Sequence, residues 1–393
     1  MRIGIVCLVL GYVLSQFYRA FLAVLAPALA ADLGTTEAVL ADAVGIWFLA
    51  FAAMQIPVGW ALDRVGPRRT AAVLLGFCSG GGALLFAAAQ GPGAILLAMA
   101  LIGIGCAPVL MSSYYIFARM YRPAVFGTLA GVVIGVGSLG NLGAALPLSL
   151  AAEAFGWRGT VAGLAVVTLA VAAAILVFVQ DPPRVAPNPA AGSLGSVLRN
   201  PALWLILLMM LVVNVPGSGI RGLWIGPYFA QVHGLDSAAI GMVTLAMGLA
   251  MVAGSFAYGP LDRLFRTRKG VVLAGNLLMV ACLLVLWYHA EAGVWAALVM
   301  IAGVGFFGMS FPVIMSHGRA LFPPHLVGRG VTLLNLFGIG GVGLFQMVSG
   351  RVHAVALAGG ATPAAAYGAV FGFFALVTLA GCAAYLFSAD RTD

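Results

Sequence analysis

A charged turn, Gly59-Trp60-Ala61-Leu62-Asp63-Arg64-Val65-Gly66-Pro67-Arg68-Arg69, separates two apolar runs that are each long enough to cross a bilayer. Its first and eighth residues are glycines, which permit close backbone approach and a tight turn. Asp63 is suited to pair with a guanidinium or to lie at the N-terminus of a neighbouring helix, where the helix dipole favours an anion. The arginines predict that the turn faces the cytoplasm. A loop that only sets orientation would need neither the glycines nor Asp63 at this spacing, so the segment predicts a further role.

The spacing Gly-x-x-x-Asp-Arg-x-Gly-x-Arg-Arg resembles the signature loop between helices 2 and 3 of the major facilitator superfamily of transporters, with Pro67 where a basic residue is common. The resemblance implies an all-α membrane protein with 12 transmembrane helices in two pseudo-symmetric six-helix bundles. It also implies that this loop is a conformational latch, and residues 259–269 resemble a degraded second copy of it. The latch residues are then Gly59, Asp63, Arg64, Gly66 and Arg68 in the first copy and Asp262 and Arg263 in the second.

The composition is that of a polytopic membrane protein. Hydrophobic residues make up 63% of the 393 residues, charged residues make up 8%, and the mean hydropathy is +1.11. Soluble globular proteins carry about 25% charged residues. At roughly 20 apolar residues per span, about a dozen helices fit the length. The apolar segments are continuous rather than alternating, which excludes a closed β-barrel.

The net charge of +8 and the isoelectric point near 9.6 follow from membrane topology. In a 12-helix layout, 15 of the 19 basic residues fall in the loops and termini on one side. Short loops rich in Arg and Lys stay in the cytoplasm. Both termini are therefore expected to be cytoplasmic, and no nucleic acid is expected as a partner. The Ala- and Arg-rich composition, with Lys269 as the one lysine, indicates a GC-rich bacterial genome and hence the bacterial inner membrane.

The sequence carries no motif typical of metal, cofactor or enzyme chemistry. Its five cysteines lie in separate apolar spans without metal-ligand spacing. It has no nucleotide-binding loop, zinc motif or nucleophile motif. We therefore expect no metal, no cofactor and no enzymatic activity. The expected partners are the lipid bilayer and a small solute, and the expected state is a monomer.

The second half of the chain repeats the first. Pro108-Val109-Leu110-Met111-Ser112 and Pro312-Val313-Ile314-Met315-Ser316 share four of five residues at an offset of 204. Residues 181–200 form the longest polar stretch and are predicted to be a cytoplasmic linker. The expected units are thus an N-terminal six-helix bundle at 1–180 and a C-terminal one at 201–393. In transporters built from such parallel repeats, the substrate lies near the bilayer midplane between the halves.

Two arginines lie inside predicted helices, Arg19 in the first and Arg221 in the seventh, at an offset of 202. An arginine at the bilayer centre costs at least about 2.5 kcal/mol and marks a functional site by default. No Asp or Glu lies at mid-depth to neutralise either one, so a bound anion is the predicted partner; a guanidinium fork suits phosphate or carboxylate. The pair resembles the substrate-binding arginines of the organophosphate:inorganic phosphate antiporter branch. The alternative is a structural role, in which each guanidinium snorkels or binds exposed backbone carbonyls.

Other polar side chains inside the predicted helices complete the candidate site. A proton symporter usually needs a titratable group within the membrane, for which Asp42 and His317 are the candidates. A packed, satisfied histidine is the alternative for His317. The eleventh helix is predicted over residues 331–349. The expected lining residues are Gln16, Tyr18, Ser113, Tyr114, Asn141, Asn214, Trp224, Tyr228, His317 and Asn335.

The fifth helix, predicted over residues 126–150, carries a row of glycines. Small residues let membrane helices approach closely. The row partly resembles the helix-5 motif of proton-driven drug exporters of the same superfamily. Ser138 follows Gly137 where that motif has a proline, which disfavours export. The glycines are Gly127, Gly131, Gly135, Gly137, Gly140 and Gly143.

The leading hypothesis is a secondary active transporter, a symporter or antiporter, that moves a small phosphate- or carboxylate-bearing anion across the inner membrane by alternating access. Anion exchange is the simplest mechanism because it needs no proton relay. Three alternatives stay open: proton-driven efflux of lipophilic compounds, Cu(I) import through the thioether pair Met247 and Met251, and a non-transporting membrane receptor. For the methionine pair, filling a gap in the core is the further alternative.

Overall fold

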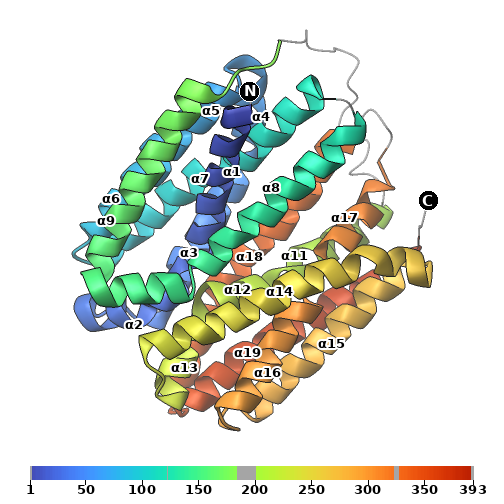
Figure 1. The fold of residues 1–393 in the computed structure, drawn as a ribbon. Helices are drawn as coiled ribbons and strands as arrows, with labels where there is room; N and C mark the ends of the chain where they lie inside the picture. Colours follow the sequence, from blue (N-terminus) through green and yellow to red (C-terminus); the bar gives the residue numbers. More distant parts are fainter. Residues whose placement is uncertain (1, 122, 184–200, 323–326, 391–393) are drawn as a thin grey trace. The chain divides into compact units, whose positions relative to one another are not determined.

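The fold was obtained as a computed structural model, which describes residues 2–121, 123–183, 201–322 and 327–390 (Figure 1). Every regular element among these residues is a helix, and two segments are π-helical. The predicted all-α class is confirmed. The predicted linker, residues 181–200, lies outside the described residues from 184 onward.

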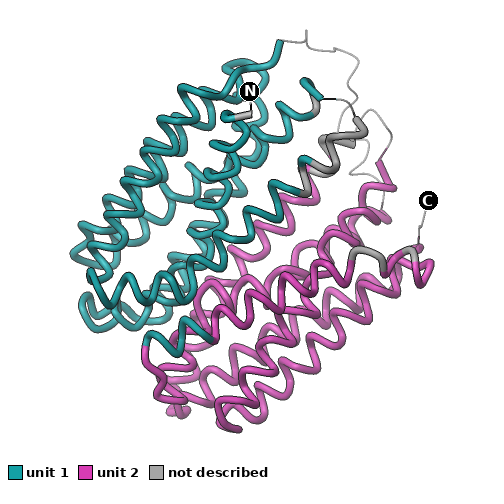
Figure 2. The backbone as a smooth tube through the Cα atoms, in the orientation of Figure 1, with its two compact units in different colours: residues 1–186, 237–242 teal, residues 187–236, 243–393 magenta. Residues whose placement is uncertain are grey.

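The first compact unit comprises residues 1–186 and 237–242 (Figure 2). Its first span is bent by 46° between α1 and α2. Its second span is α3 with α4, and its third is α5, η1 and α6. The helices are α1 (Arg2–Tyr18), α2 (Phe21–Leu33), α3 (Glu37–Ala53), α4 (Gln55–Arg64), α5 (Pro67–Val73), the π-helix η1 (Leu74–Gly80), α6 (Gly81–Ala87), α7 (Pro92–Met120), α8 (Pro123–Gly143) and α9 (Leu146–Phe178).

The second compact unit comprises residues 187–236 and 243–393. Its first span is broken into four consecutive helices, α11 to α13, and α16 and α17 together form another span. The helices are α11 (Pro201–Val213), α12 (Val215–Gly219), the π-helix η2 (Ile220–Trp224), α13 (Ile225–His233), α14 (Ser237–Phe265), α15 (Arg268–Tyr288), α16 (Val294–Phe307), α17 (Phe311–Arg319), α18 (Val327–Ala358) and α19 (Pro363–Tyr385).

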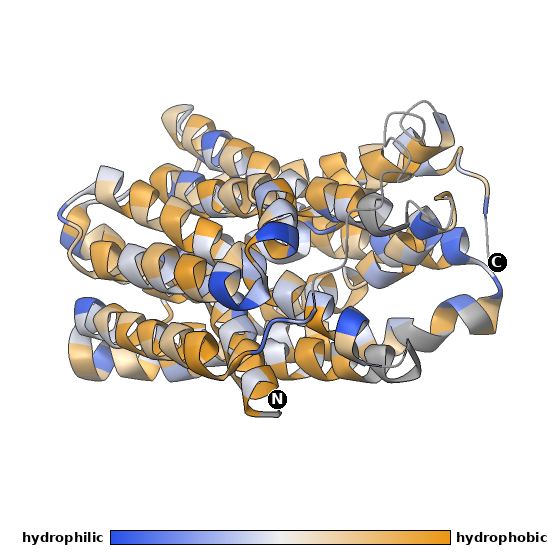
Figure 3. Cartoon of the chain, turned by 90° about the horizontal axis from the view of Figure 1, so that it is seen from above, coloured by the Kyte–Doolittle hydropathy of each residue, from blue (hydrophilic) through white to orange (hydrophobic). Residues whose placement is uncertain are grey.

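Most of the described helices are long and apolar enough to cross a membrane. Among the described residues, ten helices qualify as membrane spans, and the bent pair α1 and α2 makes an eleventh. The described part of α8 adds a shorter apolar stretch, Val132–Gly143. Hydrophobic colour dominates the helices, and hydrophilic colour is confined to scattered positions (Figure 3). The chain is therefore a multi-pass membrane protein, as its composition predicts.

The two units pack their helices in matching pairs, as the internal repeat predicts. α1 packs on α8 in the first unit, and α11 packs on α18 in the second. The third span packs on α9, and its counterpart α15 packs on α19. A Cβ on Gly140 would overlap the Val13 carbonyl, and a Cβ on Gly341, 201 positions later, would overlap the Leu211 carbonyl. Both helix crossings therefore require glycine, in line with small-residue packing in membranes.

Two spans are broken where the chain carries its inward arginines. α1 ends at Tyr18 and α2 begins at Phe21, so Arg19 lies in the break. In the second unit, α12 carries Pro216 and the π-helix η2 carries Arg221. Proline lacks the N–H of a helical hydrogen bond, and π-helical turns are frequent at functional sites. Irregular backbone at membrane depth is tolerated only where it is buried in protein or lines a polar cavity.

One predicted helix boundary is wrong in a way that affects the site. α18 continues to Ala358, nine residues beyond the predicted end at 349. Arg351 lies inside the helix, and its guanidinium donates to the Met347 carbonyl (2.9 Å). The added turns bring His353 into the interior of the second unit, where it is 1% exposed.

Candidate functional site

Arg19 is packed against aromatic rings in the first unit. Its guanidinium carbon lies 5.4 Å from the centre of the Trp47 ring and 4.9 Å from that of Phe51. These two rings, one turn apart on α3, stack on each other at 5.3 Å. A guanidinium over an aromatic face gains about 2 kcal/mol or more when both are desolvated. The rings therefore stabilise the cation in the interior of the unit.

The N–H edge of this guanidinium remains available to a ligand. Its Nε is buried and makes no hydrogen bond within the described part of the chain. The ion pairs between described residues do not include one between Arg19 and a carboxylate. Gln16, three residues earlier on α1, likewise buries its Oε1 without a hydrogen-bond partner there. A buried polar atom left unpaired costs about 1–3 kcal/mol, so this corner is suited to a polar ligand.

Arg221 is buried in the π-helix η2 of the second unit, at 4% exposure. The Gln346 side chain faces the same span: its Oε1 lies 2.6 Å from the position of a Cβ on Gly219, two residues before Arg221. Gln346 is fully buried, and neither of its amide atoms makes a hydrogen bond to a described residue. The Gln346 amide, which makes no hydrogen bond to a described residue, thus lies beside the helix segment that carries Arg221.

Four of the predicted lining residues use their polar groups to hold their own unit together. All four are fully or almost fully buried. Their polar groups are therefore already hydrogen-bonded within their own unit. These bonds join Tyr18 to the Thr168 hydroxyl (2.9 Å), the Ser113 hydroxyl to the Val109 carbonyl (3.1 Å), the Trp224 indole to the Ser349 hydroxyl (2.9 Å) and the Tyr228 hydroxyl to the Ala290 carbonyl (2.7 Å).

The other predicted lining residues on these helices are only half-buried. Asn214 lies at the break between α11 and α12, where its carbonyl accepts the Ser218 N–H (3.0 Å). It is therefore close in sequence to the irregular segment of Arg221. The half-buried residues are Tyr114, Asn141, Asn214 and Asn335.

The two predicted proton-coupling candidates occupy different settings. His317 is fully buried near the end of α17. Its Nδ1 shares a hydrogen bond with the Tyr385 hydroxyl, and its Nε2 bonds to the Ala389 carbonyl (2.9 Å). The ring thus ties α17 to the end of α19, which favours the satisfied histidine over a proton carrier. Asp42 is half-buried in the second turn of α3.

The charged turn is held by a network within the first unit. Asp63 accepts hydrogen bonds from the Tyr115 hydroxyl (3.0 Å) and the Arg119 guanidinium (3.3 Å), both on α7. Gly66 has φ +100°, which favours glycine, and a Cβ there would contact the Asp181 carboxylate. Gly66 and Asp63 therefore both take part in the contacts that hold the turn, and their role as a latch stays a prediction.

An acidic residue caps the helix after the charged turn in each unit. Asp181 accepts the backbone N–H of Arg68 (2.8 Å) at the start of α5. Asp390 accepts the backbone N–H groups of Arg268 (3.2 Å) and Lys269 (3.0 Å) at the start of α15. The unpaired N–H groups and the dipole of a helix N-terminus stabilise an anion. Our sequence interpretation missed both caps; their signal is an acidic residue directly after the sixth and the twelfth helix.

The other predicted latch residues make fewer contacts. A Cβ on Gly59 would meet no described atom within 4 Å, so the close approach expected there is not seen. The side chain of Arg263 lies outside the described residues. The remaining contacts place the Arg64 guanidinium over the Trp60 ring (5.1 Å) and Asp262 opposite Arg268 (3.7 Å).

The methionine pair considered for copper packs against a neighbouring helix. A Cβ on Gly305 of α16 would lie 3.1 Å from Cγ of Met251 and 3.2 Å from Cγ of Met247. Met247 is fully buried. Nowhere in the described ranges do three or more His, Cys, Asp or Glu side chains form a group that could hold a metal. This position favours the gap-filling role of methionine.

His353 is a buried titratable residue that our sequence interpretation missed. Its ring centre lies 5.1 Å from that of Trp224 and 4.6 Å from that of Tyr367. It shares one face of α18 with Gln346 and Ser349, since positions 346, 349 and 353 follow the spacing i, i+3, i+7. That spacing is the signal that could have identified it, had the helix been extended past 349.

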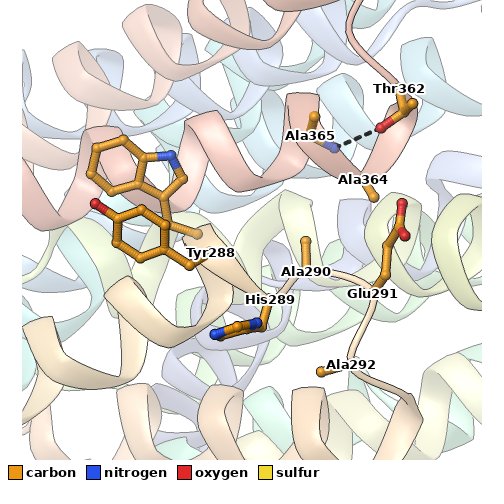
Figure 4. A pocket seen from close by; sticks show the side chains of 9 residues that line it. Tyr288, His289, Ala290, Glu291, Ala292, Thr362, Ala364 and Ala365 are labelled. Carbon is orange, nitrogen blue, oxygen red and sulfur yellow. Dashed lines mark hydrogen bonds between the residues drawn. The ribbon is translucent and has the colours of Figure 1, made fainter.

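A cavity of about 450 Å³ opens between the loop that joins α15 to α16 and the start of α19 (Figure 4). His289 and Glu291 line it from the loop, and the Glu291 side chain points toward the start of α19 (Figure 4). Ala290 of the same loop accepts the hydrogen bond of Tyr228. The Tyr228 ring contacts Tyr367 at 5.6 Å, so Tyr228 links Ala290 in the cavity wall to the aromatic cluster around His353.

Known proteins resemble this chain in sequence. The profile of the family described as Major Facilitator Superfamily matches residues 8–220. "Multidrug resistance protein B homolog" of Mycobacterium tuberculosis is 30% identical over 222 residues, 56% of this chain and 38% of that protein. "Probable sulfoacetate transporter SauU" of Cupriavidus necator is 24% identical over 312 residues, 72% of this chain and 71% of that protein. "Putative transporter AraJ" of Escherichia coli is 25% identical over 202 residues, and the chain spans half its length.

Solved structures resemble the chain over nearly its whole length. A D-xylose–proton symporter matches with a TM-score of 0.80 at 15% identity, covering 98% of this chain and 97% of that chain. A bacterial homologue of the human lysosomal transporter Spinster, inward-facing and occupied, matches with a TM-score of 0.78 at 18% identity, covering 98% and 96%. The fold is therefore the predicted one, with 12 helices in two six-helix bundles.

Proposed function

Because the chain belongs to the Major Facilitator Superfamily of transporters, we propose that it is a secondary active transporter that moves a small anion by alternating access. Arg19 and Arg221 bind the anion in this proposal, and Gln16 and Gln346 add hydrogen bonds to it. The substrate class is a small solute with a carboxylate, sulfonate or phosphate group. The membrane is the bacterial inner membrane, with both termini and the charged turn in the cytoplasm and the protein acting as a monomer.

The setting of Arg19 is the observation that carries this proposal. Trp47 and Phe51 cover the faces of the guanidinium, whereas its Nε–H makes no hydrogen bond to a described residue. Aromatic faces lower the cost of burying the charge without using the in-plane donors. Those donors form the rigid fork that binds carboxylate, sulfonate or phosphate oxygens in pairs. A purely structural arginine would spend the same donors on carbonyls.

The relative from Cupriavidus necator supports the substrate class. Its name assigns it sulfoacetate, which carries a sulfonate and a carboxylate. A guanidinium suits either of these anionic groups, and that relative aligns with 72% of this chain. Sulfoacetate is therefore the first probe that we would use.

A thermal-shift experiment tests the proposal. Purified protein in detergent is heated with sulfoacetate, inorganic phosphate or acetate, and separately with the lipophilic cation tetraphenylphosphonium. We expect stabilisation by at least one anion, and its loss in Arg19→Ala and Arg221→Ala. Each charge-assisted contact is worth about 1.5–3 kcal/mol, so each variant should bind about tenfold more weakly or worse. Arg69→Ala, an exposed arginine of the charged turn, is the matched control and should bind like the wild type.

A second candidate is proton-driven export of lipophilic compounds. The observation in its favour is the 30% identity to the multidrug resistance relative over 222 residues. Stabilisation by tetraphenylphosphonium alone, unchanged in both arginine variants, would replace the anion proposal with this one.

A further inference from the structure

His353 is the buried imidazole of the second unit that is packed on aromatic rings. Trp224 of η2 and Tyr367 of α19 contact it with tilted rings at 5.1 and 4.6 Å. The faces of these rings can stabilise an imidazolium as they do a guanidinium. An imidazole is also the side chain whose charge changes most readily between pH 5 and 8. His353 is thus placed in a setting that can hold it in either charge state.

The same histidine is connected to the segment that carries Arg221. The Trp224 indole, which contacts His353, donates to the Ser349 hydroxyl, and that hydroxyl donates to the Gln346 carbonyl (2.7 Å). Trp224 lies three residues after Arg221 in the same π-helix, η2. The charge on His353 is therefore felt at Arg221 through low-dielectric protein, where Coulomb interactions are strong.

Several charged or titratable groups lie on the described elements around His353. Tyr228 and His233 bond to each other at 3.2 Å and pack against Tyr367 through the Tyr228 ring. The cavity between the α15–α16 loop and the start of α19 is lined by Ala290, whose carbonyl accepts the Tyr228 hydroxyl (Figure 4). The groups on the neighbouring elements, and on α18 itself, are Arg221, Tyr228, His233, His289, Glu291, Arg351 and Tyr367.

We propose that His353 binds the proton that travels with the anion, so that the chain is a proton–anion symporter; this rests on the proposed anion transport. In this proposal a proton binds the imidazole of His353. The cationic His353 raises the positive potential at the anion site, and the bound anion in turn stabilises the cationic form. Such coupling is reciprocal, since each ligand raises the affinity of the other by the same factor.

Proteoliposomes with the pH dye pyranine inside test the symport, with sulfoacetate as the probe. Its charge is constant between pH 6 and 8, because carboxylates titrate near pH 4. For the wild type we expect uptake to acidify the lumen and the half-saturating concentration to fall about tenfold from pH 8 to pH 6. His353→Gln should bind sulfoacetate with a pH-independent affinity and should not acidify the lumen. His289→Gln, an exposed residue of the cavity, is the matched control and should behave like the wild type.

Each other outcome rejects the inference. Uptake by the wild type without acidification, or acidification that persists in His353→Gln, overturns it and leaves anion transport standing. A sulfoacetate affinity that is equal at pH 6 and pH 8 in the wild type also overturns it, which decides the case even if His353→Gln and His353→Asn do not fold. If neither Arg19→Ala nor Arg221→Ala changes anion binding, the proposed function fails and the inference fails with it.

Discussion

Two guanidinium groups of the first unit use their donors in different ways. Arg158 donates to the Ala87 and Ala89 carbonyls (3.1 and 2.6 Å) and to the Asp32 carboxylate (3.0 Å). Both guanidiniums lie over aromatic rings, Arg158 over Trp157 and Arg19 over Trp47 and Phe51, but the Arg19 Nε makes no hydrogen bond within the described structure. The first pattern locks helices together, whereas the second leaves donors for a ligand. We therefore expect a structural role for Arg158 and a ligand-binding role for Arg19.

That contrast predicts opposite results for the same conservative change. We expect Arg19→Lys to weaken sulfoacetate binding about tenfold with little loss of thermal stability, because an ammonium cannot bind two oxygens in parallel. Arg158→Lys should lower the unfolding temperature, since it loses the fork that bridges two carbonyls and a carboxylate, but should keep the anion affinity. Calorimetric titration and thermal unfolding of both variants measure the two effects. Equal losses of affinity would contradict a ligand role for Arg19.

Asp390 should make stability depend on pH at the end of α19. Burial raises its pKa, but hydrogen bonds from Thr267 and from the backbone N–H groups of Lys269 and Arg268, with the charge of His317, outweigh this and hold the pKa below its usual value. A carboxylate with a lowered folded-state pKa stabilises the fold above the unfolded value, about 3.9, and loses that effect as pH falls through the folded value.

We therefore expect Asp390→Asn to unfold at a lower temperature than the wild type at pH 7, and the gap to close below pH 4. The effect should stay below about 1 kcal/mol because the carboxylate is largely exposed to solvent. Thermal unfolding of both proteins from pH 7 to pH 3 measures it. Glu153→Gln, an exposed acid on α9, serves as control and should show no gap at any pH. A gap that widens on acidification would refute the assignment.

The roles of single residues are only partly predictable from sequence, because the fold determines which partner a polar group meets. Arg19 and Arg221 are candidates because an arginine inside an apolar span is energetically costly. The bonds of Tyr18 and His317, by contrast, go to residues 150 and 68 positions away in the chain. No local pattern reveals such partners, so a satisfied tyrosine and a ligand-binding one look alike in sequence.

At the scale of elements, the glycine rows make a sharp prediction. In α8, a Cβ on Gly140 would overlap the Val13 carbonyl of α1, whereas a Cβ on Gly135 would meet nothing within 4 Å. We expect Gly140→Ala to destabilise the first unit by about 1–3 kcal/mol through overpacking. Gly135→Ala should be neutral or slightly stabilising, because alanine is the better helix former by about 1 kcal/mol. Thermal unfolding of the two variants side by side decides, and equal behaviour would disprove the close crossing.

Helix interiors were predictable, but breaks and ends were less so. Continuous apolar runs and prolines such as Pro216 predict spans and kinks from sequence. The π-helical turns at η1 and η2 are set by packing between helices, which leaves no local mark. The helix α18 continues through Gly350 and Arg351 to Ala358, although the sequence shows a glycine followed by an arginine where we predicted its end. His353 was missed for this reason.

At the scale of the whole molecule, the duplicated pattern predicted the architecture well. The repeat at an offset of 204 predicts two similar halves, and α1 packs on α8 as α11 packs on α18. The repeat does not predict which residues hold each charged turn in place. Asp181 and Asp390 act from the far ends of their units, more than 100 residues from the N–H groups that they cap. Such long-range capping follows from the bundle, and no turn motif encodes it.

The charged turn leads to the last prediction, which concerns transport by the whole molecule. Asp63 accepts a hydrogen bond from Tyr115 and pairs with Arg119 at 3.3 Å. Asp63→Asn keeps an acceptor for the tyrosine but removes the charge, so the latch on α7 weakens while the anion site is untouched. We expect sulfoacetate uptake into proteoliposomes to fall about tenfold with binding affinity unchanged, because lid and hinge steps often limit turnover.

Arg119→Gln should reproduce this loss, and the double variant should be no worse than either single one, since both changes break one interaction. Arg69→Gln removes a charge from the same turn at an exposed position and is the control, with uptake expected near the wild-type rate. Fully additive losses in the double variant, or an equal loss in Arg69→Gln, would mean that net charge of the turn matters and the specific pair does not. Unchanged uptake in Asp63→Asn would remove the latch from the mechanism, because the pair would then be a static link between α4 and α7.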